Sequence, residues 1–493
     1  MASIVVNGDT SGSVTLSAPA TAGTVTVTLP SASGTMAVSG ASPSFTTITT
    51  TSDASISGLT VGKGGGAVST NTAVGASALA ANTTGDSNVA VGGSALSVST
   101  TVGRNTAIGY SAGRDTTTGH VTAVGSYALA ANTTGDSNVA VGGNNESASA
   151  ALQTNTTGSN NTAVGVSALQ ASSTGGNNTA IGKDALYANT TASQNIAVGF
   201  QAGYSNTTGT PITAVGYQAL LSHTTGSDNV AVGYQAMRDT TTGYECVAVG
   251  AQSLWNNTTG LRNTALGNNC LRSNSTASDN TAVGWYALRP TTGGTNTAVG
   301  AGAATNVTSG SGNTVIGNGG ASGLTGGANN TYLGLNTNIS GANVSNELLV
   351  CSGAGYTGKG ANTGFITPNG GGCYQGNNSS SWSTTSDRRL KKNIVDNTEG
   401  LDVINQIRVR NFEYRTAEEV TELPAHTVID KQGVQLGVIA QELQEVCPDC
   451  VKEETTGVIS VDSDNIFWHM INAIKDLKAE LDTVKAELAA LKG

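Results

Sequence analysis

Residues 71–79 read Asn-Thr-Ala-Val-Gly-Ala-Ser-Ala-Leu, and this stretch decides the fold because variants of it recur over more than half of the chain. Of the fifteen intervals between successive copies of its glycine, twelve are 17 residues, two are 16 and one is 23. Self-similarity at a fixed period predicts a stack of repeated units. The motif glycine occupies positions 75, 92, 109, 125, 142, 165, 182, 199, 216, 233, 250, 267, 284, 300, 317 and 334.

Each position of the repeat has a physical interpretation. The residue before the glycine is always Val, Ile or Leu, and the residue two before it is Ala in fourteen copies. This pattern predicts a short strand with a small residue at a tight packing position, and glycine permits the bend that follows. Asn stands four residues before the glycine in thirteen copies, which predicts amide ladders between stacked strands. One unit has too little apolar surface to fold alone, so neighbouring units must bury it.

Composition narrows the class of protein further. The 493 residues include 66 Gly, while charged residues make up 11% and aromatic residues 4%. Without a strict Gly-X-Y register collagen is excluded, and the scarcity of charge argues against a charge-rich disordered chain. The net charge of −10 gives no support to nucleic-acid binding. Because no run of about 18 apolar residues occurs, membrane insertion is not expected.

The fold class that follows is mainly β: an elongated solenoid rod of 17-residue repeats. The small inner Ala implies a thin core, which favours several chains around one axis, with a homotrimer as the natural number. The unit Asn-Thr-Ala-Val-Gly-x-x-Ala-Leu resembles the repeat of trimeric autotransporter adhesin heads over residues 68–338. That resemblance implies a parallel β-roll in a trimer.

The chain divides by composition into four predicted regions. Residues 1–66 form an N-terminal β region, with strands expected at 13–16 and 25–29, and are a possible attachment end. Residues 67–338 form the rod of sixteen repeats, and residues 339–386 a Gly/Asn/Ser-rich β junction. Residues 387–493 hold 33 of the 54 charged residues and 5 of the 66 glycines, which indicates a separate α+β domain.

The tail of this domain, residues 466–493, has the pattern of a coiled coil. Apolar residues recur there at alternating spacings of three and four over more than three heptads, which predicts a self-associating helix. A helix packed on its own domain is the alternative. The predicted seam consists of Phe467, Met470, Ile474, Leu477, Leu481, Val484, Leu488 and Leu491.

The segment Ser386-Asp387-x-x-x-Lys391, followed by Ala440-Gln441-Glu442 and the terminal heptads, resembles the endosialidase-type intramolecular chaperone domain. The resemblance covers residues 383–493. It implies a domain that trimerises, templates the β-rich fibre upstream of it and then cuts itself off. Ser386 is the implied nucleophile and Lys391 the implied base.

The residues are suited to that chemistry. A serine hydroxyl needs a base, and a lysine serves as one when burial or nearby cations lower its pKa. Arg388, Arg389 and Lys392 supply cations beside Lys391. The expected scissile bond is Ser386–Asp387, with Thr385–Ser386 as the alternative.

No metal site and no cofactor are expected. Cys447 and Cys450 form an isolated C-x-x-C, and zinc requires four ligands. The six cysteines do not suggest a disulfide framework. The four histidines, at 120, 223, 426 and 469, are far apart in the sequence and predict no metal cluster.

These features together favour a structural bacteriophage tail fibre that contacts the host cell surface. Its expected partners are two further copies of the chain, a surface glycan or protein receptor, and other virion proteins. Its expected location is the virion, after assembly in the host cytoplasm, because the N-terminus lacks the pattern of a secretory signal. The predicted chemistry is single-turnover self-cleavage. A tailspike depolymerase acting on surface polysaccharide and a bacterial trimeric surface adhesin are the alternatives.

Overall fold

The computed structural model describes residues 53–56, 59–143, 149–369, 371–375, 383–384, 387–416, 418–423, 429, 431–453 and 457–493. The chain separates into two compact units, Met1–Thr384 and Thr385–Gly493, and each is described by itself. The strands expected at 13–16 and 25–29 lie outside the described residues.

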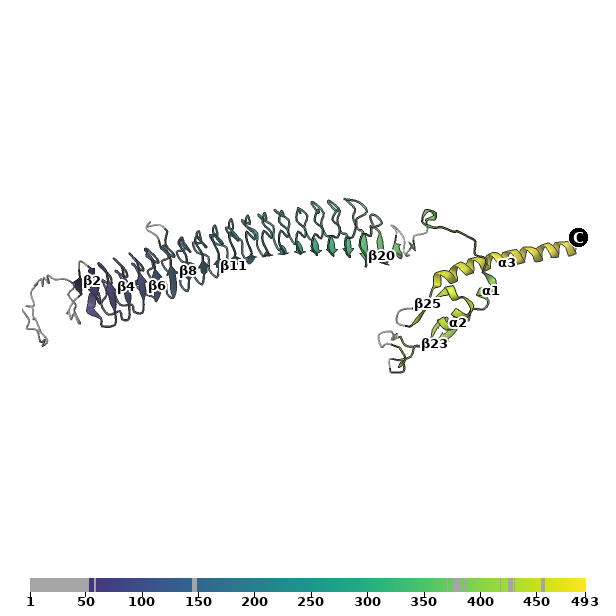
Figure 1. The fold of residues 1–493 in the computed structure, drawn as a ribbon, viewed down its shortest axis with the longest axis horizontal. Coiled ribbons are helices and arrows are strands. Elements are labelled where there is room, and N and C mark those ends of the chain that lie inside the picture. Colours follow the sequence, from purple (N-terminus) through teal and green to yellow (C-terminus); the bar gives the residue numbers. More distant parts are fainter. Residues whose placement is uncertain are drawn as a thin grey trace, which may run out of the picture. The chain divides into compact units, whose positions relative to one another are not determined.

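The first unit contains a β-solenoid of about 17 turns with a 17-residue spacing, as the repeat predicts. Each turn contributes one short strand, and successive strands pair in parallel, so the turns lie side by side in chain order (Figure 1). The repeat strands are β3 (Thr72–Val74), β4 (Val89–Val91), β5 (Thr106–Ile108), β6 (Val121–Val124), β7 (Asn138–Val141), β8 (Thr162–Val164), β9 (Thr179–Ile181), β10 (Ile196–Val198), β11 (Ile212–Val215), β12 (Asn229–Val232), β13 (Val247–Val249), β14 (Thr264–Leu266), β15 (Thr281–Val283), β16 (Thr297–Val299), β17 (Thr314–Ile316) and β18 (Thr331–Leu333).

The motif glycine fixes the distance between turns. Gly216, directly after β11, has φ of +137°, a conformation that side chains strongly disfavour. A Cβ atom at this position would lie 2.3 Å from the carbonyl oxygen of Gly233 in the next turn. Glycine therefore recurs because two turns of backbone approach each other more closely than a methyl group allows.

The core is formed by two columns of residues inside one chain. The repeated Ala of the strands pairs with its equivalent in the next turn, as Ala73 does with Ala90 and Ala90 with Ala107. The second column is formed by the residue four positions after the motif glycine, which is Leu in nine of the sixteen copies, and Leu96 is fully buried. Leu96 and Ser94 both lie in the left-handed backbone region, with φ of +49° and +59°. Burial in the stack therefore overrides the local backbone preference of these residues.

Asparagines connect the turns, as the sequence predicts. In the first asparagine column, four residues before each glycine, Asn88 Oδ1 accepts from the backbone N–H of Asn105 at 3.0 Å and Asn88 Nδ2 donates to the Val102 carbonyl at 3.0 Å. A second asparagine column includes Asn189 and Asn206, which lie in neighbouring turns. There Asn206 Nδ2 donates to Asn189 Oδ1 at 3.2 Å. Most of these buried amides therefore bond to backbone or side chains of their own or an adjacent turn, although Asn82 Oδ1, Asn105 Nδ2 and Asn155 Oδ1 have no protein partner among the described residues.

Antiparallel strands lie at both ends of this stack. β1 (Ala54–Ile56) pairs with β2 (Leu59–Gly62), and β2 pairs antiparallel with the first repeat strand β3. At the other end, β19 (Leu348–Cys351) and β20 (Gly364–Asn369) continue the parallel order. β21 (Gly371–Gln375) and β22 (Ser383–Thr384) then pair antiparallel beyond β20.

The core becomes wider towards the C-terminal end of the rod. From β17 onward the inner Ala is replaced in turn by Val315, Tyr332, Leu349 and Phe365, all of them buried. The Tyr332 hydroxyl donates to Glu347 Oε2 at 2.7 Å, and both residues are almost completely buried. Larger side chains and a buried polar pair therefore fill the last turns.

The second unit is a small α+β region with a long terminal helix. Among its described residues, the strands form two antiparallel pairs: β23 (Arg410–Phe412) with β24 (Gln435–Gly437), and β25 (Val451–Glu453) with β26 (Ile459–Val461). Its helices are α1 (Leu401–Ile404), α2 (Ala440–Val446) and α3 (Ser463–Lys492), with the 3₁₀ turns η2 (Arg388–Leu390) and η4 (Pro448–Cys450). Leu443, Cys447 and Cys450 form its buried core, against which Val403 and Ile466 pack.

Candidate self-processing site and chaperone domain

The predicted catalytic segment lies at the start of the second unit, and the structure describes only part of it. Ser386, the predicted nucleophile, and Thr385 lie outside the described residues. Asp387, on the other side of the expected scissile bond, caps η2: its Oδ1 accepts from the backbone N–H of Arg389 at 2.9 Å. The side-chain hydrogen bond from Arg389 holds the pKa of the Asp387 carboxyl below its usual value.

Lys391, the predicted base, directly follows this turn. Its backbone N–H donates to the Arg388 carbonyl at 3.1 Å, which closes η2, and its side chain is exposed in the single chain. The exposed cations Arg388 and Lys392 flank it in sequence. The turn therefore sets Asp387 and Lys391 at the two ends of one short, strongly charged segment. The assignment of Ser386 and Lys391 as nucleophile and base stays a prediction.

The rest of this unit follows the order of elements expected from the sequence. The helical pattern at 400–407 contains α1, the strand pattern at 409–414 contains β23, and the strand-to-helix pattern at 435–443 contains β24 and the start of α2. α1 is held against α3, because the Leu401 backbone N–H donates to Asp476 Oδ2 at 3.0 Å and Asn472 Nδ2 donates to the Asn397 carbonyl at 2.9 Å.

The predicted coiled-coil residues all lie on α3. The helix starts at Ser463, three residues before the predicted boundary at 466, and Asp462 caps it by accepting from the N–H groups of Asp464 and Asn465. All eight seam residues are between 47% and 84% exposed in the single chain. His469 and Ala473, by contrast, are buried against the unit's own elements. The helix thus packs on its own domain through one set of residues and leaves the predicted seam uncovered.

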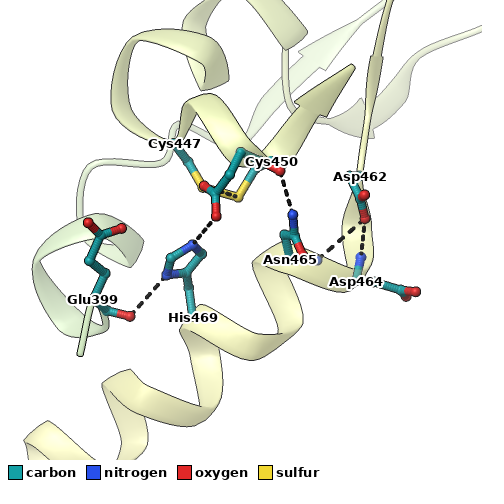
Figure 2. Close-up of a disulfide and its surroundings, with 8 residues drawn as sticks. Glu399, Cys447, Cys450, Asp462, Asp464, Asn465 and His469 are labelled. Atoms are coloured by element: carbon teal, nitrogen blue, oxygen red, sulfur yellow. Dashed lines mark hydrogen bonds and ion pairs between the residues drawn. A yellow bond between two sulfur atoms is a disulfide. The ribbon is translucent and has the colours of Figure 1, made fainter. Parts of the chain in front are cut away.

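The sequence predicts no metal site at the isolated C-x-x-C, and the structure places two further potential ligand residues beside it. Cys447 and Cys450 are joined by a disulfide, and His469 from α3 lies beside them (Figure 2). Asp449, between the two cysteines in sequence, belongs to the same cluster. One potential ligand atom from each of the four residues lies within 4.8 Å of the others. Residue spacing alone could not reveal this cluster, because β25, β26 and the connection between them separate His469 from the cysteines.

The family model described as chaperone of endosialidase, peptidase S74, matches residues 386–452. The C-terminal unit contains an endosialidase chaperone domain. The matched segment begins at Ser386 and includes Lys391, α1, β23, β24, α2 and η4. An endosialidase chaperone domain implies self-processing of the β-solenoid that precedes it, and such domains function in trimeric proteins.

One curated relative carries a short similar segment. The chain is 29% identical over 111 residues to "Myelin regulatory factor homolog 1" of Caenorhabditis elegans. The aligned part covers 21% of this chain and 12% of the relative, so the likeness concerns a small part of both. No solved structure matches the chain. Among the described helices, none has the length and apolar character needed to cross a membrane.

Proposed function

We propose that this chain is a trimeric fibre whose endosialidase chaperone domain guides assembly of the rod and then separates from it by cleavage at Ser386. The observation that carries the proposal is the position of the chaperone domain directly after a β-solenoid. Ser386 acts as the nucleophile, Lys391 as its base, and Ser386–Asp387 is the bond that breaks. In the assembled trimer Lys391 accepts the proton of the Ser386 hydroxyl.

Two exposed apolar surfaces support the trimer. The first is the seam of α3, whose eight residues would bury one another in a three-stranded coiled coil. The second is a row along the rod formed by the aliphatic residue before the motif glycine, for example Ile108, Ile181 and Ile316, which are 41–44% exposed. Apolar rows of this length are characteristic of interfaces between chains.

The rod also has a physical need for a chaperone. Turns that are nearly identical can pair in several wrong registers between chains, because a shift of one repeat preserves most contacts. A C-terminal domain that joins three chains at one end fixes their register and raises the effective concentration of the strands. Removing that domain afterwards leaves the fibre kinetically trapped in its folded form.

Expression of the wild-type chain beside Ser386→Ala and Lys391→Met tests the cleavage. The wild type should release residues 387–493, a fragment of 107 residues beginning with Asp387, whereas both variants should stay at full length in mass spectra. Lys392→Met, a neutralised lysine at the next position, is the matched control and should be cleaved. A fragment beginning with Ser386 would instead place the cut at Thr385–Ser386, and an uncut wild type would refute the proposal.

Light scattering after size-exclusion chromatography tests the trimer. Ser386→Ala should have the mass of three full-length chains, and adding Leu481→Asp in the seam should abolish this assembly. Lys485→Asp, on the same helix but outside the seam, should keep it. A monomeric Ser386→Ala protein, or a trimer that tolerates Leu481→Asp, would contradict this part of the proposal.

We further propose that the fibre belongs to a virion tail, where it binds other virion proteins and contacts a host surface receptor. Exposed aromatic rings of Phe200, Tyr217 and Tyr234 stack from turn to turn, with centroids 5.3 and 5.4 Å apart. Such a flat strip suits the apolar face of a sugar ring.

The triple Ser variant of Phe200, Tyr217 and Tyr234 should lose binding on a glycan array, while Tyr244→Ser should keep it. Equal binding by both variants would rule out the strip as the receptor site.

A further inference from the structure

Four potential metal ligands come together where η4 meets α3. Cys447 and Cys450 flank Asp449 on a tight turn, and His469 reaches them from the second turn of α3 (Figure 2). Cys447 is 2%, Cys450 0% and His469 3% exposed, and the four ligand atoms lie within 4.8 Å of one another. Buried thiol and imidazole groups at this separation match the donor set that zinc prefers.

The hydrogen bonds of His469 turn one ring nitrogen towards the cluster. Nδ1 lies 2.9 Å from the backbone carbonyl oxygen of Glu399. A carbonyl only accepts, so Nδ1 carries the proton and Nε2 of the neutral ring carries the lone pair. A metal-binding histidine usually has this arrangement, with its second nitrogen bonded to a backbone carbonyl.

The other nitrogen faces a second electron donor. His469 Nε2 lies 3.4 Å from Asp449 Oδ2, and Asp449 Oδ1 lies 3.2 Å from Cys447 Sγ. An imidazole nitrogen and a carboxylate oxygen at this distance share one cation, which is either a proton on Nε2 or a metal ion between them. The same carboxylate also reaches Cys447 Sγ, so the imidazole, the carboxylate and the cysteines face one position.

We propose that the reduced chain binds one zinc ion through Cys447 Sγ, Cys450 Sγ, His469 Nε2 and an Asp449 carboxylate oxygen. Zinc binds such ligands tetrahedrally, at about 2.3 Å from sulfur and about 2.0–2.2 Å from nitrogen or oxygen. The two thiol protons leave as the ion binds, so no oxidant or reductant is consumed. The disulfide of this structure and the zinc complex are mutually exclusive forms of the same pair of cysteines.

The site would fasten the terminal helix to the rest of the chaperone domain. Cys447, Asp449 and Cys450 belong to the segment matched by the family model, whereas His469 belongs to α3, beyond it. α3 is already connected to η4 by the hydrogen bond from Asn465 Nδ2 to the Asp449 carbonyl at 2.5 Å. Asp449 and His469 also line a solvent-open pocket of about 260 Å³, through which an ion can enter. Bound zinc would therefore hold the base of the seam-bearing helix in place.

Metal analysis of the full chain tests the site. The chain is expressed with added zinc, purified under reducing conditions, and the species carrying residues 447–469 is analysed by mass spectrometry for metal content. One zinc per chain is expected in the wild type and less than a tenth of that in Cys447→Ser/Cys450→Ser. Cys351→Ser and His120→Gln, a cysteine and a histidine of the rod, are matched controls that should keep the full amount.

Cobalt separates a ligand role from a merely structural one. Co²⁺ bound to the wild type should show thiolate-to-metal charge-transfer absorption. His469→Gln should lose most of the binding while its circular dichroism stays that of the wild type. If His469→Gln fails to fold, Asp449→Asn replaces it and should weaken the affinity at least tenfold. Reduced, folded wild type without bound metal, or zinc retained in the double serine variant, would overturn the proposal. A disulfide that survives reducing purification and excludes zinc would also overturn it.

Discussion

His223 in the second asparagine column makes the stability of the rod depend on pH. The imidazole is fully buried between Asn206 Oδ1 and Asn229 Nδ2, each 3.1 Å from a ring nitrogen. One nitrogen therefore donates and the other accepts, which is the pattern of the neutral ring. Burial lowers the pKa of His223 from 6.5 to about 4. Protonation would add a buried charge and point a second N–H at the amide of Asn229.

The direction and size of the effect follow from that pKa. Above pH 6.5 the ring is neutral in the folded and unfolded chain, so stability is complete. Between pH 6.5 and about 4 the unfolded chain binds a proton that the folded chain does not. The free energy of unfolding therefore decreases as the pH is lowered through this range. At about 1.4 kcal/mol per pKa unit, the loss reaches about 3 kcal/mol near pH 4.

The perturbation that isolates this effect is His223→Asn, which restores the residue found at the equivalent positions 189, 206 and 257. The variant should match the wild type near neutral pH and exceed its stability by about 3 kcal/mol near pH 4. Urea unfolding followed by circular dichroism, repeated across this range, measures the difference. His120→Asn, which removes an exposed histidine paired with Asp136 in the same rod, should show no gain in stability near pH 4. Equal acid sensitivity of wild type and His223→Asn would refute the reasoning.

Three further substitutions test the turn-to-turn contacts, each by thermal and urea unfolding. Gly216→Ala should destabilise the rod by about 3 kcal/mol or more, because its Cβ meets the Gly233 carbonyl oxygen at a positive φ; a loss below about 1 kcal/mol would be inconsistent with that clash. Cys246→Asn should stabilise by about 1 kcal/mol, since it adds an amide at one of the three positions where the first asparagine column lacks one; unchanged or lower stability would speak against this. Tyr332→Phe should lower stability by about 1–3 kcal/mol by removing the hydrogen bond to buried Glu347, and a neutral result would mean that other donors compensate.

The strands and their register could be predicted from the sequence because each turn repeats the same solution. A period of 17 residues, an inner Ala and a recurring Asn leave one way to stack the strands, and Ala73, Ala90 and Ala107 pair as this requires. The left-handed backbone of Leu96 and Ser94 could not be predicted, because leucine disfavours that conformation in isolation. Contacts with the neighbouring turns, which local propensity does not contain, decide it.

The two candidate sites also differ in how far the sequence predicts them. Ser386 and Lys391 could be proposed because they lie five residues apart within a recognisable segment, and the order of elements after them agrees with it. The cluster of His469 with Cys447 and Cys450 was missed because it depends on how α3 packs against η4. Helix packing of this kind brings together residues whose spacing in sequence carries no signal.

The wider core at the C-terminal end of the rod has a consequence for how the fibre comes apart. A stack of turns behaves as a one-dimensional array, in which each turn is held only by its neighbours and opening begins at the ends. Most turns bury an alanine, but the last ones bury Tyr332, Leu349 and Phe365 and therefore hold their neighbours through much larger contacts. In the sequence these turns are the last ones before the proposed cut, where the rod would lose its covalent link to the chaperone. Their larger contacts would keep the newly freed end of the stack from unfolding turn by turn.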